Sequence, residues 1–367
     1  MDEKRIVERF LEYIKIDSES RCEKKFADRI VADLEEMGLR VVRDDAGAKA
    51  GSDTTNIIAY LDGEPGLEPI LLSAHLDTVP PGKNIEPVIE NGVIRSAGNT
   101  ILGSDDKSGV VAIMEAVKTV VDEKIPHRPV EIAFTVCEEV GLLGAKYMDY
   151  SLIASKNAIA FDSGGDIGTI VNLAPGHIEI EATITGKAAH AGVAPETGIS
   201  AIEAAAHAVS AMKLLRVDPE TTANVGTFTA IGPNNIVPEK VQLKMEVRSR
   251  NGEKLNAHKD HLIDCMEKAC DAFGAKLDYT AETSYISYFV PENDPLITLI
   301  ADCCGKIGAK VVVKPTGGGS DANFFNANGL HAVVIGTGMT DVHGVNESIT
   351  VKNLVDCAKL TLEMIKA

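Results

Sequence analysis

Acidic and histidine side chains follow four apolar stretches of this sequence, at the point where each stretch ends. They are His75 and Asp77 in "ILLSAHLDTVP", Glu138 and Glu139 in "VCEEVG", Asp162 in "AIAFDSGG" and His343 in "GTGMTDVHGVNE". A further acidic pair, Asp105 and Asp106 in "GSDDK", lies in a glycine-bounded loop before an expected helix. Carboxylates and imidazoles are common ligands of divalent metal ions. The chemistry to consider is therefore metal binding.

Each of these groups also has an ordinary explanation. Residues two apart in a strand point the same way, so Asp77 can orient His75, but a turn would also use this pair. Helix capping explains one of Asp105 and Asp106, although two adjacent carboxylates repel each other without a cation. A solvated turn explains an isolated glutamate pair. The recurrence of such groups at four strand ends favours a ligand site over these ordinary explanations, because open α/β sheets bind ligands at the carboxyl ends of their strands.

The expected elements place these groups together. Strands are predicted at 56–61, 69–74, 130–136, 158–161 and 331–335, and helices at 22–37, 107–121 and 294–307. This alternation indicates an α/β domain with a mostly parallel mixed sheet flanked by helices. Between 177 and 287 the strands alternate apolar and polar residues around helices at 198–214 and 253–273. We expect residues 1–176 and 288–367 to form one domain and 177–287 an inserted α+β domain with an antiparallel sheet.

Composition excludes several classes of protein. A net charge of −18 argues against nucleic acid and anionic membranes as partners, because both attract basic surfaces. No run of 18 apolar residues predicts a membrane span, and the N-terminus lacks the apolar centre of a signal peptide. The seven cysteines contain no C-x-x-C pair. The sequence therefore predicts a cytoplasmic protein. A nucleotide-binding α/β protein is the alternative from another class, but "GGGSD" and "GTG" match neither phosphate-loop pattern.

Five ordered motifs resemble a known family. "HLDTVP", "GSDDKSG", "CEEVGLLGA", "FDSGG" and "HGVNE" are similar to the co-catalytic dizinc peptidases, which include peptidase T, carboxypeptidase G, aminoacylase and succinyl-diaminopimelate desuccinylase. The resemblance covers nearly the whole chain, and "LGSDDKSGVVAIMEA" and "GGGSDAN" look closest to the peptidase T branch. It implies two zinc ions per chain, with cobalt or manganese as alternatives.

The resemblance also implies the roles of the metal ligands. His75 and Asp162 would bind one ion, Glu139 and His343 would bind the other, and Asp105 would bridge the two. Two ions about 3.5–4 Å apart can lower the pKa of a shared water and polarise a carbonyl group.

Further roles follow from the same resemblance. Glu138 would be the general base, Asp77 would orient His75, and the peptide bond between Asp105 and Asp106 would be cis. Two adjacent glutamates are useful because a ligand and a base cannot be the same side chain.

Substrate contacts are implied outside these motifs. His190 would reach the active site of a neighbouring subunit and stabilise the oxyanion, and Asn235 would contact substrate. Arg248 could clamp a carboxylate, and Gly318 lies in a glycine loop that could approach the substrate backbone. An ordinary loop histidine, a turn residue and a surface ion pair are the plain alternatives for the first three. Peptidase T tends to carry an arginine where this chain has Gly317. That departure removes one carboxylate anchor and counts against strict tripeptide specificity.

These observations predict a zinc-dependent exopeptidase, an aminopeptidase that acts on tripeptides or other short peptides. The enzyme alternative is a deacylase or carboxypeptidase that uses the same metals on N-acylated amino acids. We also expect a homodimer, in which an edge strand and the alanine-rich helix at 198–214 of the insert meet their copies.

Overall fold

The polypeptide folds into two compact units. The computed structural model describes residues 1–366. The first unit comprises Met1–Leu173, Phe289–Pro315 and Ser320–Ala367, and the second comprises Ala174–Tyr288 and Thr316–Gly319. The chain therefore leaves the first unit and returns to it, and the short segment Thr316–Gly319 belongs to the second.

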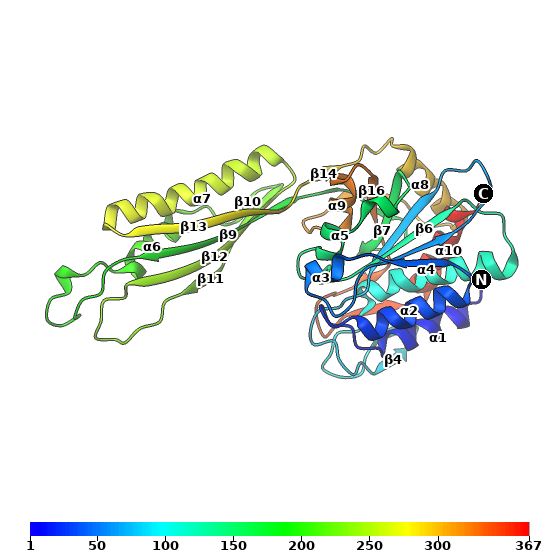
Figure 1. Cartoon of the computed structure of the whole chain (residues 1–367), viewed down its shortest axis with the longest axis horizontal. Helices are drawn as coiled ribbons and strands as arrows, with labels where there is room; N and C mark the ends of the chain where they lie inside the picture. Colours follow the sequence, from blue (N-terminus) through cyan, green and yellow to red (C-terminus); the bar gives the residue numbers. More distant parts are fainter. Residues whose placement is uncertain (367) are drawn as a thin grey trace. The chain divides into compact units, whose positions relative to one another are not determined.

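A nine-stranded sheet forms the centre of the first unit (Figure 1). Its order is β1 (Arg40–Arg43), β2 (Ile57–Leu61), β6 (Val130–Thr135), β3 (Ile70–His75), β7 (Asn157–Ser163), β16 (His331–Gly336), β8 (Thr169–Ala174) and β14 (Tyr288–Phe289), with β15 (Val312–Pro315) paired to β8. The four neighbours β6, β3, β7 and β16 are parallel, so their carboxyl ends share one edge. Strands β3 and β6 are buried throughout, as expected of apolar runs covered on both faces.

Helices pack against this sheet. Helix α4 (Ser104–Glu123) contacts β3 and β7, and it packs with α1 (Glu3–Ile14) and α10 (Val351–Ile365). Helix α9 (Asp321–Ala327) contacts β7 and β16. The remaining helices of the unit are α2 (Lys24–Glu36), α3 (Ala46–Ala50), α5 (Leu143–Tyr147) and α8 (Pro295–Ile307). The predicted fold class, including its mostly parallel mixed sheet, is confirmed.

A small antiparallel sheet in the first unit was not predicted. It consists of β17 (Met339–Thr340), β18 (Ser348–Thr350), β5 (Val93–Ser96) and β4 (Pro87–Glu90). Strands of two to four residues are too short to give a recognisable alternation of apolar and polar positions. This sheet matters for the site because β17 and β18 bracket the loop that carries His343.

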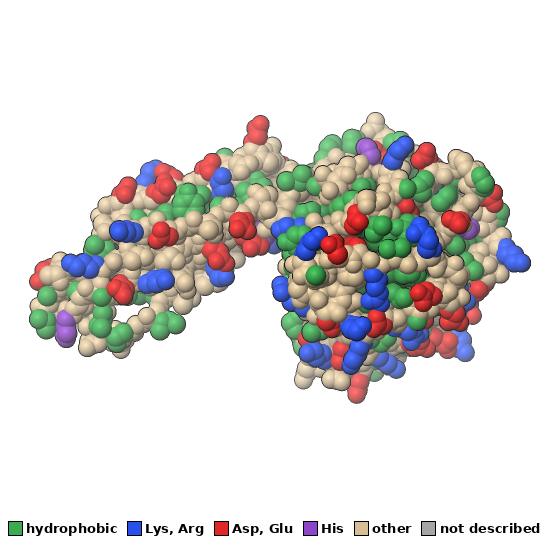
Figure 2. Space-filling model, in the orientation of Figure 1, with side chains coloured by type: hydrophobic (Ala, Val, Ile, Leu, Met, Phe, Trp, Pro, Cys, Tyr) green, Lys and Arg blue, Asp and Glu red, His purple; other side chains and the backbone are tan. Residues whose placement is uncertain are grey.

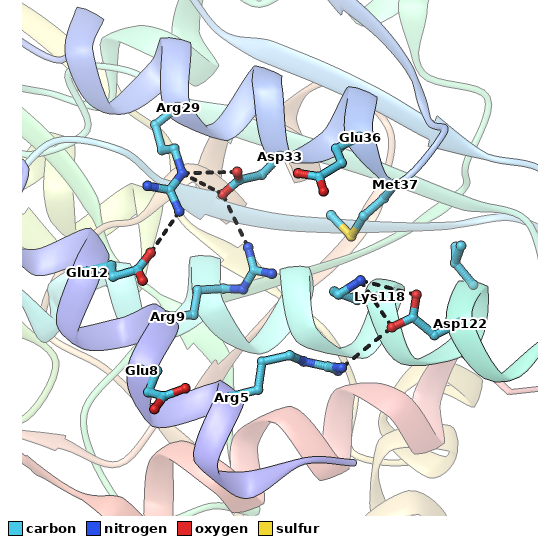
Figure 3. Close-up of a pocket in the computed structure, with 11 residues that line it drawn as sticks. Arg5, Glu8, Arg9, Glu12, Arg29, Asp33, Glu36, Met37, Lys118 and Asp122 are labelled. Carbon is cyan, nitrogen blue, oxygen red and sulfur yellow. Dashed lines mark hydrogen bonds and ion pairs between the residues drawn. The ribbon is translucent and has the colours of Figure 1, made fainter.

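Ion pairs fasten the N-terminal helices to α4. Glu115 of α4 is fully buried, and its carboxylate lies 2.6 Å from Nε of Arg5 and 2.5 Å from Nε of Arg9. A cavity of about 320 Å³ lies beside these arginines. There Arg9 also reaches Asp33 and Arg5 also reaches Asp122 (Figure 3). Removing one partner of such a buried pair typically costs about 3–5 kcal/mol. The arrangement is thus a structural clamp.

The second unit is a five-stranded antiparallel sheet with two helices on one face (Figure 1). Its strands are β10 (Leu215–Asp218), β11 (Thr221–Thr229), β12 (Lys240–Ser249), β9 (Gly176–Thr185) and β13 (Lys276–Tyr285), and its helices are α6 (Ala201–Ala211) and α7 (Gly252–Phe273). Buried alternate residues such as Ile180 and Leu243 face the helices, whereas Glu181 and Lys244 are exposed.

One reason for expecting a dimer contact through α6 is wrong, whereas the dimer itself stays a prediction. The alanine-rich face of α6 was assigned to a contact between copies of the chain. Instead, Ala201, Ala204, Ala205 and Ala208 are buried in the core of the unit, where α6 packs against α7, β9 and β12. Small side chains allow this close approach between elements of one chain, so the same residues are not available to a partner.

Charged side chains of both signs are scattered over the face of the molecule that Figure 2 shows. Figure 2 shows lysines and arginines interspersed with aspartates and glutamates over the visible face, rather than gathered in a separate basic patch. Across residues 1–366, no helix has both the length and the apolar character that crossing a membrane requires.

Candidate metal centre

Neighbouring strand ends bring the predicted metal ligands together in the first unit. His75 is the last residue of β3, Asp162 lies near the end of β7, and Glu138 and Glu139 follow β6. His343 lies in the loop between β17 and β18, where its φ is +63°. His75, Glu138, Glu139 and Asp162 therefore lie at or just after the carboxyl ends of strands of the large sheet, which give them a rigid base, whereas His343 is carried by a loop.

Asp105 lies between the two histidines. Its Oδ1 is 3.1 Å from Nε2 of His75, and its Oδ2 is 3.2 Å from Nε2 of His343. Asp105 has non-helical backbone angles at the start of α4, and its peptide bond to Asp106 is cis, as the resemblance implied. Because its two oxygens face two different imidazoles, one carboxylate can serve two ions at once.

Two groups of donor atoms overlap at His75. Ligand atoms of His75, Asp105 and Glu139 lie within 4.8 Å of one another, and so do those of His75, Glu138 and Asp162. His343 adds a third contact set, with Nε2 3.0 Å from Oε2 of Glu139. Glu138 and Glu139 therefore both have a carboxylate oxygen near His75, and distance to this ring alone does not separate a base from a ligand.

The tautomer of His75 suits a metal ligand. Its Nδ1 is 2.9 Å from the backbone carbonyl of Asp77 and 3.5 Å from the carboxylate of the same residue. An Nδ1–H that donates to this carbonyl leaves the lone pair on Nε2, the atom that faces Asp105. The orienting acceptor is thus mainly the main chain of Asp77, whereas the resemblance implied its side chain.

The Asp77 carboxylate has another task. Its Oδ1 accepts the backbone N–H of Glu138 at 2.9 Å. Its Oδ2 accepts the N–H of Glu139 at 3.2 Å and the hydroxyl of Ser20 at 2.7 Å. Asp77 therefore fixes the turn that presents both glutamates.

The electrostatics of the site fit bound cations. Burial, followed by repulsion from Asp162, raises the pKa of Glu138 well above its usual range, and burial with repulsion from Asp105 does the same for Asp162. Hydrogen bonds with Asp105 and Glu139 raise the pKa of His343 to about 10. Within residues 1–366, Oε1 of Glu139 is buried without a hydrogen-bond partner. Crowded carboxylates, two imidazoles and an unsatisfied oxygen form a donor set that suits zinc, cobalt or manganese.

Two of the predicted substrate residues lie side by side in the second unit. His190 and Ile236 form an isolated bridge, and the N–H of Ala191 donates to the carbonyl of Asn235 at 2.9 Å. Both His190 and Asn235 are exposed. Nδ1 of His190 accepts the N–H of Gly192 at 3.2 Å, so the neutral ring carries its proton on Nε2 as a free donor.

Of the other two predicted substrate residues, Arg248 contacts Tyr285, and Gly318 is the chain neighbour of Gly319, which packs against the ring of the same tyrosine. The guanidinium of Arg248 is paired with Glu246 through Nε and Nη2, at 3.2 and 3.0 Å, and its Nη1 is 3.3 Å from the Tyr285 hydroxyl. A Cβ on Gly319 would overlap the ring of Tyr285, so this glycine permits the close approach. Gly318 is half-buried beside it. Only part of the guanidinium is thus available to a carboxylate.

Two buried acids of the site were not predicted. Glu347 is the last residue of the "HGVNE" motif, and its carboxylate accepts hydrogen bonds from the loop that leads to Asp105. Asp321 lies in the "GGGSDAN" loop, binds the hydroxyl of Thr135, and has a pKa that burial raises to about 6. Both residues lie inside motifs on which the family resemblance was based. Membership of these motifs was the one feature of the sequence that could have identified them.

Comparisons with known proteins agree on one family. The sequence model of "Peptidase family M20/M25/M40" matches residues 71–367. The crystal structure of aminopeptidase PepT from Bacillus cereus ATCC 10987 is 37% identical, with a TM-score of 0.93 and coverage of 100% of this chain and 98% of that one. A tripeptidase from Staphylococcus aureus subsp. aureus Mu50 is 35% identical, with a TM-score of 0.96 and the same coverage. The YXEP protein of Bacillus subtilis, described as a dinuclear metal-binding peptidase of the M20 family, is 17% identical, with a TM-score of 0.75 over 99% of this chain and 97% of that one.

We expect protein purified without chelator to contain two divalent ions per chain by elemental analysis. Removing them should lower the unfolding temperature, because ions that bind only the native state stabilise it by about 4.1 kcal/mol per site at a free concentration of 1,000 Kd. Adding zinc back to the stripped protein is the control. An unfolding temperature that is the same with and without metal would contradict the assignment.

Proposed function

Because the chain belongs to peptidase family M20/M25/M40 and is therefore a metallopeptidase, we propose that it is an aminopeptidase that releases N-terminal residues from tripeptides and other short peptides. The proposal of metal-dependent hydrolysis rests mainly on the position of Asp105, whose two carboxylate oxygens face His75 and His343. The substrate class is supported by the likeness, over the whole chain, to an aminopeptidase and a tripeptidase.

We propose that two ions, zinc or else cobalt or manganese, occupy the centre. His75 and Asp162 would hold the first, Glu139 and His343 the second, and Asp105 both. When bound, such a pair of ions supplies an activated water and polarises the scissile carbonyl. The chain's own contribution is the spacing of the donors, which the strand ends and the Asp77 carboxylate fix.

Glu138 is the proposed general base. Its backbone is held by Asp77, its side chain is 8% exposed, and a ligand atom of its carboxylate lies near His75 and Asp162. From that position it takes a proton from the attacking water and delivers it to the leaving amine. Glu139, whose Oε2 lies against His343, is left as the ligand.

The second unit supplies the proposed substrate contacts. The free Nε2–H of His190 is suited to donate a hydrogen bond to the oxyanion, with Asn235 beside it. The Nη1 side of Arg248, close to Tyr285 and the glycine loop at Gly318, is suited to bind the carboxylate at the end of a short peptide. The guanidinium keeps Glu246 as a partner while it does so.

We propose that the protein works as a homodimer in the cytoplasm. Strand β13 is ten residues long and lies at the edge of its sheet, where exposed backbone groups can pair with a second copy. In the dimer, His190 would act in the active site of the partner subunit. The cytoplasmic assignment is supported by the seven cysteines, all of which have free thiols.

Glutamine substitutions separate the two glutamates. Glu138→Gln should keep both ions and lose roughly 10²–10⁴-fold in rate, because only proton transfer is removed. Glu139→Gln should weaken metal binding itself, because a ligand is lost. Elemental analysis and peptide hydrolysis on the same preparations check this. Loss of metal in Glu138→Gln with retention in Glu139→Gln would mean that base and ligand are exchanged.

The substrate class is tested by assaying tripeptides, dipeptides and N-acetylated amino acids side by side with the metal-loaded enzyme. We expect tripeptides to be hydrolysed fastest and blocking of the free amino group to abolish hydrolysis. Faster hydrolysis of N-acetylated amino acids would reject the aminopeptidase proposal in favour of a deacylase.

Subunit mixing tests whether His190 acts across a dimer. We expect Glu138→Gln and His190→Ala subunits each to be nearly inactive, since loss of one oxyanion donor typically costs about 2.7–4 kcal/mol in the transition state. If His190 acts in the partner's site, one site of a mixed dimer carries both defects and the other neither, so activity should partly return. Mixing each variant with itself is the control. No recovery after verified exchange would place the action of His190 in its own chain, or nowhere.

A further inference from the structure

Glu347 is a buried carboxylate that accepts four hydrogen bonds from one loop. It is 1% exposed and directly precedes β18. Its Oε2 accepts the backbone N–H groups of Leu102 and Gly103, at 2.8 and 2.9 Å. Its Oε1 accepts the hydroxyl of Ser104 at 2.6 Å and the N–H of Asp105 at 3.0 Å. Both oxygens are thus saturated by protein donors, so Glu347 is not itself a candidate metal ligand.

The four donors belong to the four consecutive residues that lead up to the bridging carboxylate and include it. Asp105 has extended rather than helical backbone angles, φ −84° and ψ 105°, so the first turn of α4 does not fix its position. The position of Asp105 is held instead by the hydrogen bond from its own N–H to Glu347. Because the Asp105 oxygens lie 3.1 and 3.2 Å from two imidazole nitrogens, a small shift of this backbone would move the bridge relative to both.

Glu347 also anchors the loop that carries His343. Among residues 341–347, all of them described, Glu347 alone is buried, and the side chain of His343 is 53% exposed. The N–H of Glu347 donates to the carbonyl of Gly344 at 3.0 Å, which closes the turn after the histidine. One side chain therefore joins two ligand-bearing loops whose contact residues, Asp105 and Glu347, are 242 positions apart.

We propose that Glu347 is a positioning residue that sets the separation of Asp105 and His343, and through it the affinity for the ion that these two residues share. The inference rests on the metal pair of the proposed function. The expected effect has the size found for residues that orient metal ligands, a 10–100-fold loss of metal affinity on substitution.

The test compares Glu347→Gln with Glu131→Gln. A glutamine at 347 keeps the shape but turns an amide NH₂ toward backbone N–H donors, so at least one hydrogen bond is lost. Glu131 is a matched control: it is 6% exposed and accepts the N–H groups of Ala154 and Ser155, but it lies near the start of β6, away from the ligands that follow its end. Both variants lose bonds to backbone from a buried carboxylate, so both should unfold at a lower temperature.

The experiment measures Co²⁺ binding to the full-length, metal-stripped chain. Calorimetry gives the affinity for each ion, and the visible absorption of bound cobalt reports the coordination geometry. We expect Glu347→Gln to bind one of two Co²⁺ ions 10–100-fold more weakly with an altered spectrum, and Glu131→Gln to match the wild type in both. Equal affinities and spectra in all three proteins would overturn the positioning role. A wild-type chain that binds no second ion would instead reject the metal pair itself.

Ser104→Ala covers the case in which Glu347→Gln does not fold. It removes one of the four hydrogen bonds, from a hydroxyl that is not a proposed ligand. We expect weaker binding of the same ion, by less than in Glu347→Gln, and a spectral change in the same direction. A folded Ser104→Ala protein with wild-type affinity and spectrum would count against the proposal.

Discussion

The site depends on crowding carboxylates of like charge at one buried edge of a sheet. Asp105, Glu138, Glu139 and Asp162 each lie within a few ångströms of one or both imidazoles, and burial acts against the ionised form of each. Such a cluster is costly unless positive charge or hydrogen-bond donors face every oxygen. Parallel strands β6, β3, β7 and β16 impose the crowding, because their carboxyl ends coincide. The rest of the first unit can be understood as the means of compensating this charge.

The acids of the site fall into two kinds, according to the groups that compensate their negative charge. Asp77 and Glu347 accept backbone N–H groups with both oxygens, so they hold loops and have no lone pair directed at an ion. Asp105 and Glu139 face imidazole nitrogens, and one oxygen of Glu139 lacks any partner among residues 1–366. The same chemical group thus serves as scaffold or as proposed ligand according to which donors surround it. A list of acidic residues alone does not make this distinction, but the hydrogen bonds do.

Much of the framework could be predicted from the sequence, because apolar runs such as β3 and β6 are stable only when buried as strands of the central sheet. The boundaries of these two strands were predicted to within two residues. The acids after these runs were found for the same reason. The small sheet of β4, β5, β17 and β18 was missed because its strands are too short to show a period. Glu347 was missed because its importance lies in donors more than 240 positions away. The burial of the α6 alanines was misjudged because a small apolar face suits a core and an interface equally well.

The positions of the two histidines are fixed in different ways, and this difference affects how the proposed ions would be held. His75 ends a fully buried strand, is 2% exposed, and has its ring fixed by the Asp77 carbonyl, so its position is set by the sheet. His343 lies on a loop that is exposed except at Glu347, and its ring contacts only carboxylates of the site among the ion pairs described. Ordering such a loop costs conformational entropy. An ion bound through His343, as proposed, would have to overcome whatever part of that cost remains, and a buried carboxylate that already fixes the end of the loop reduces it. The proposed first ion position would therefore be organised by folding, and the proposed second position by folding together with the ion.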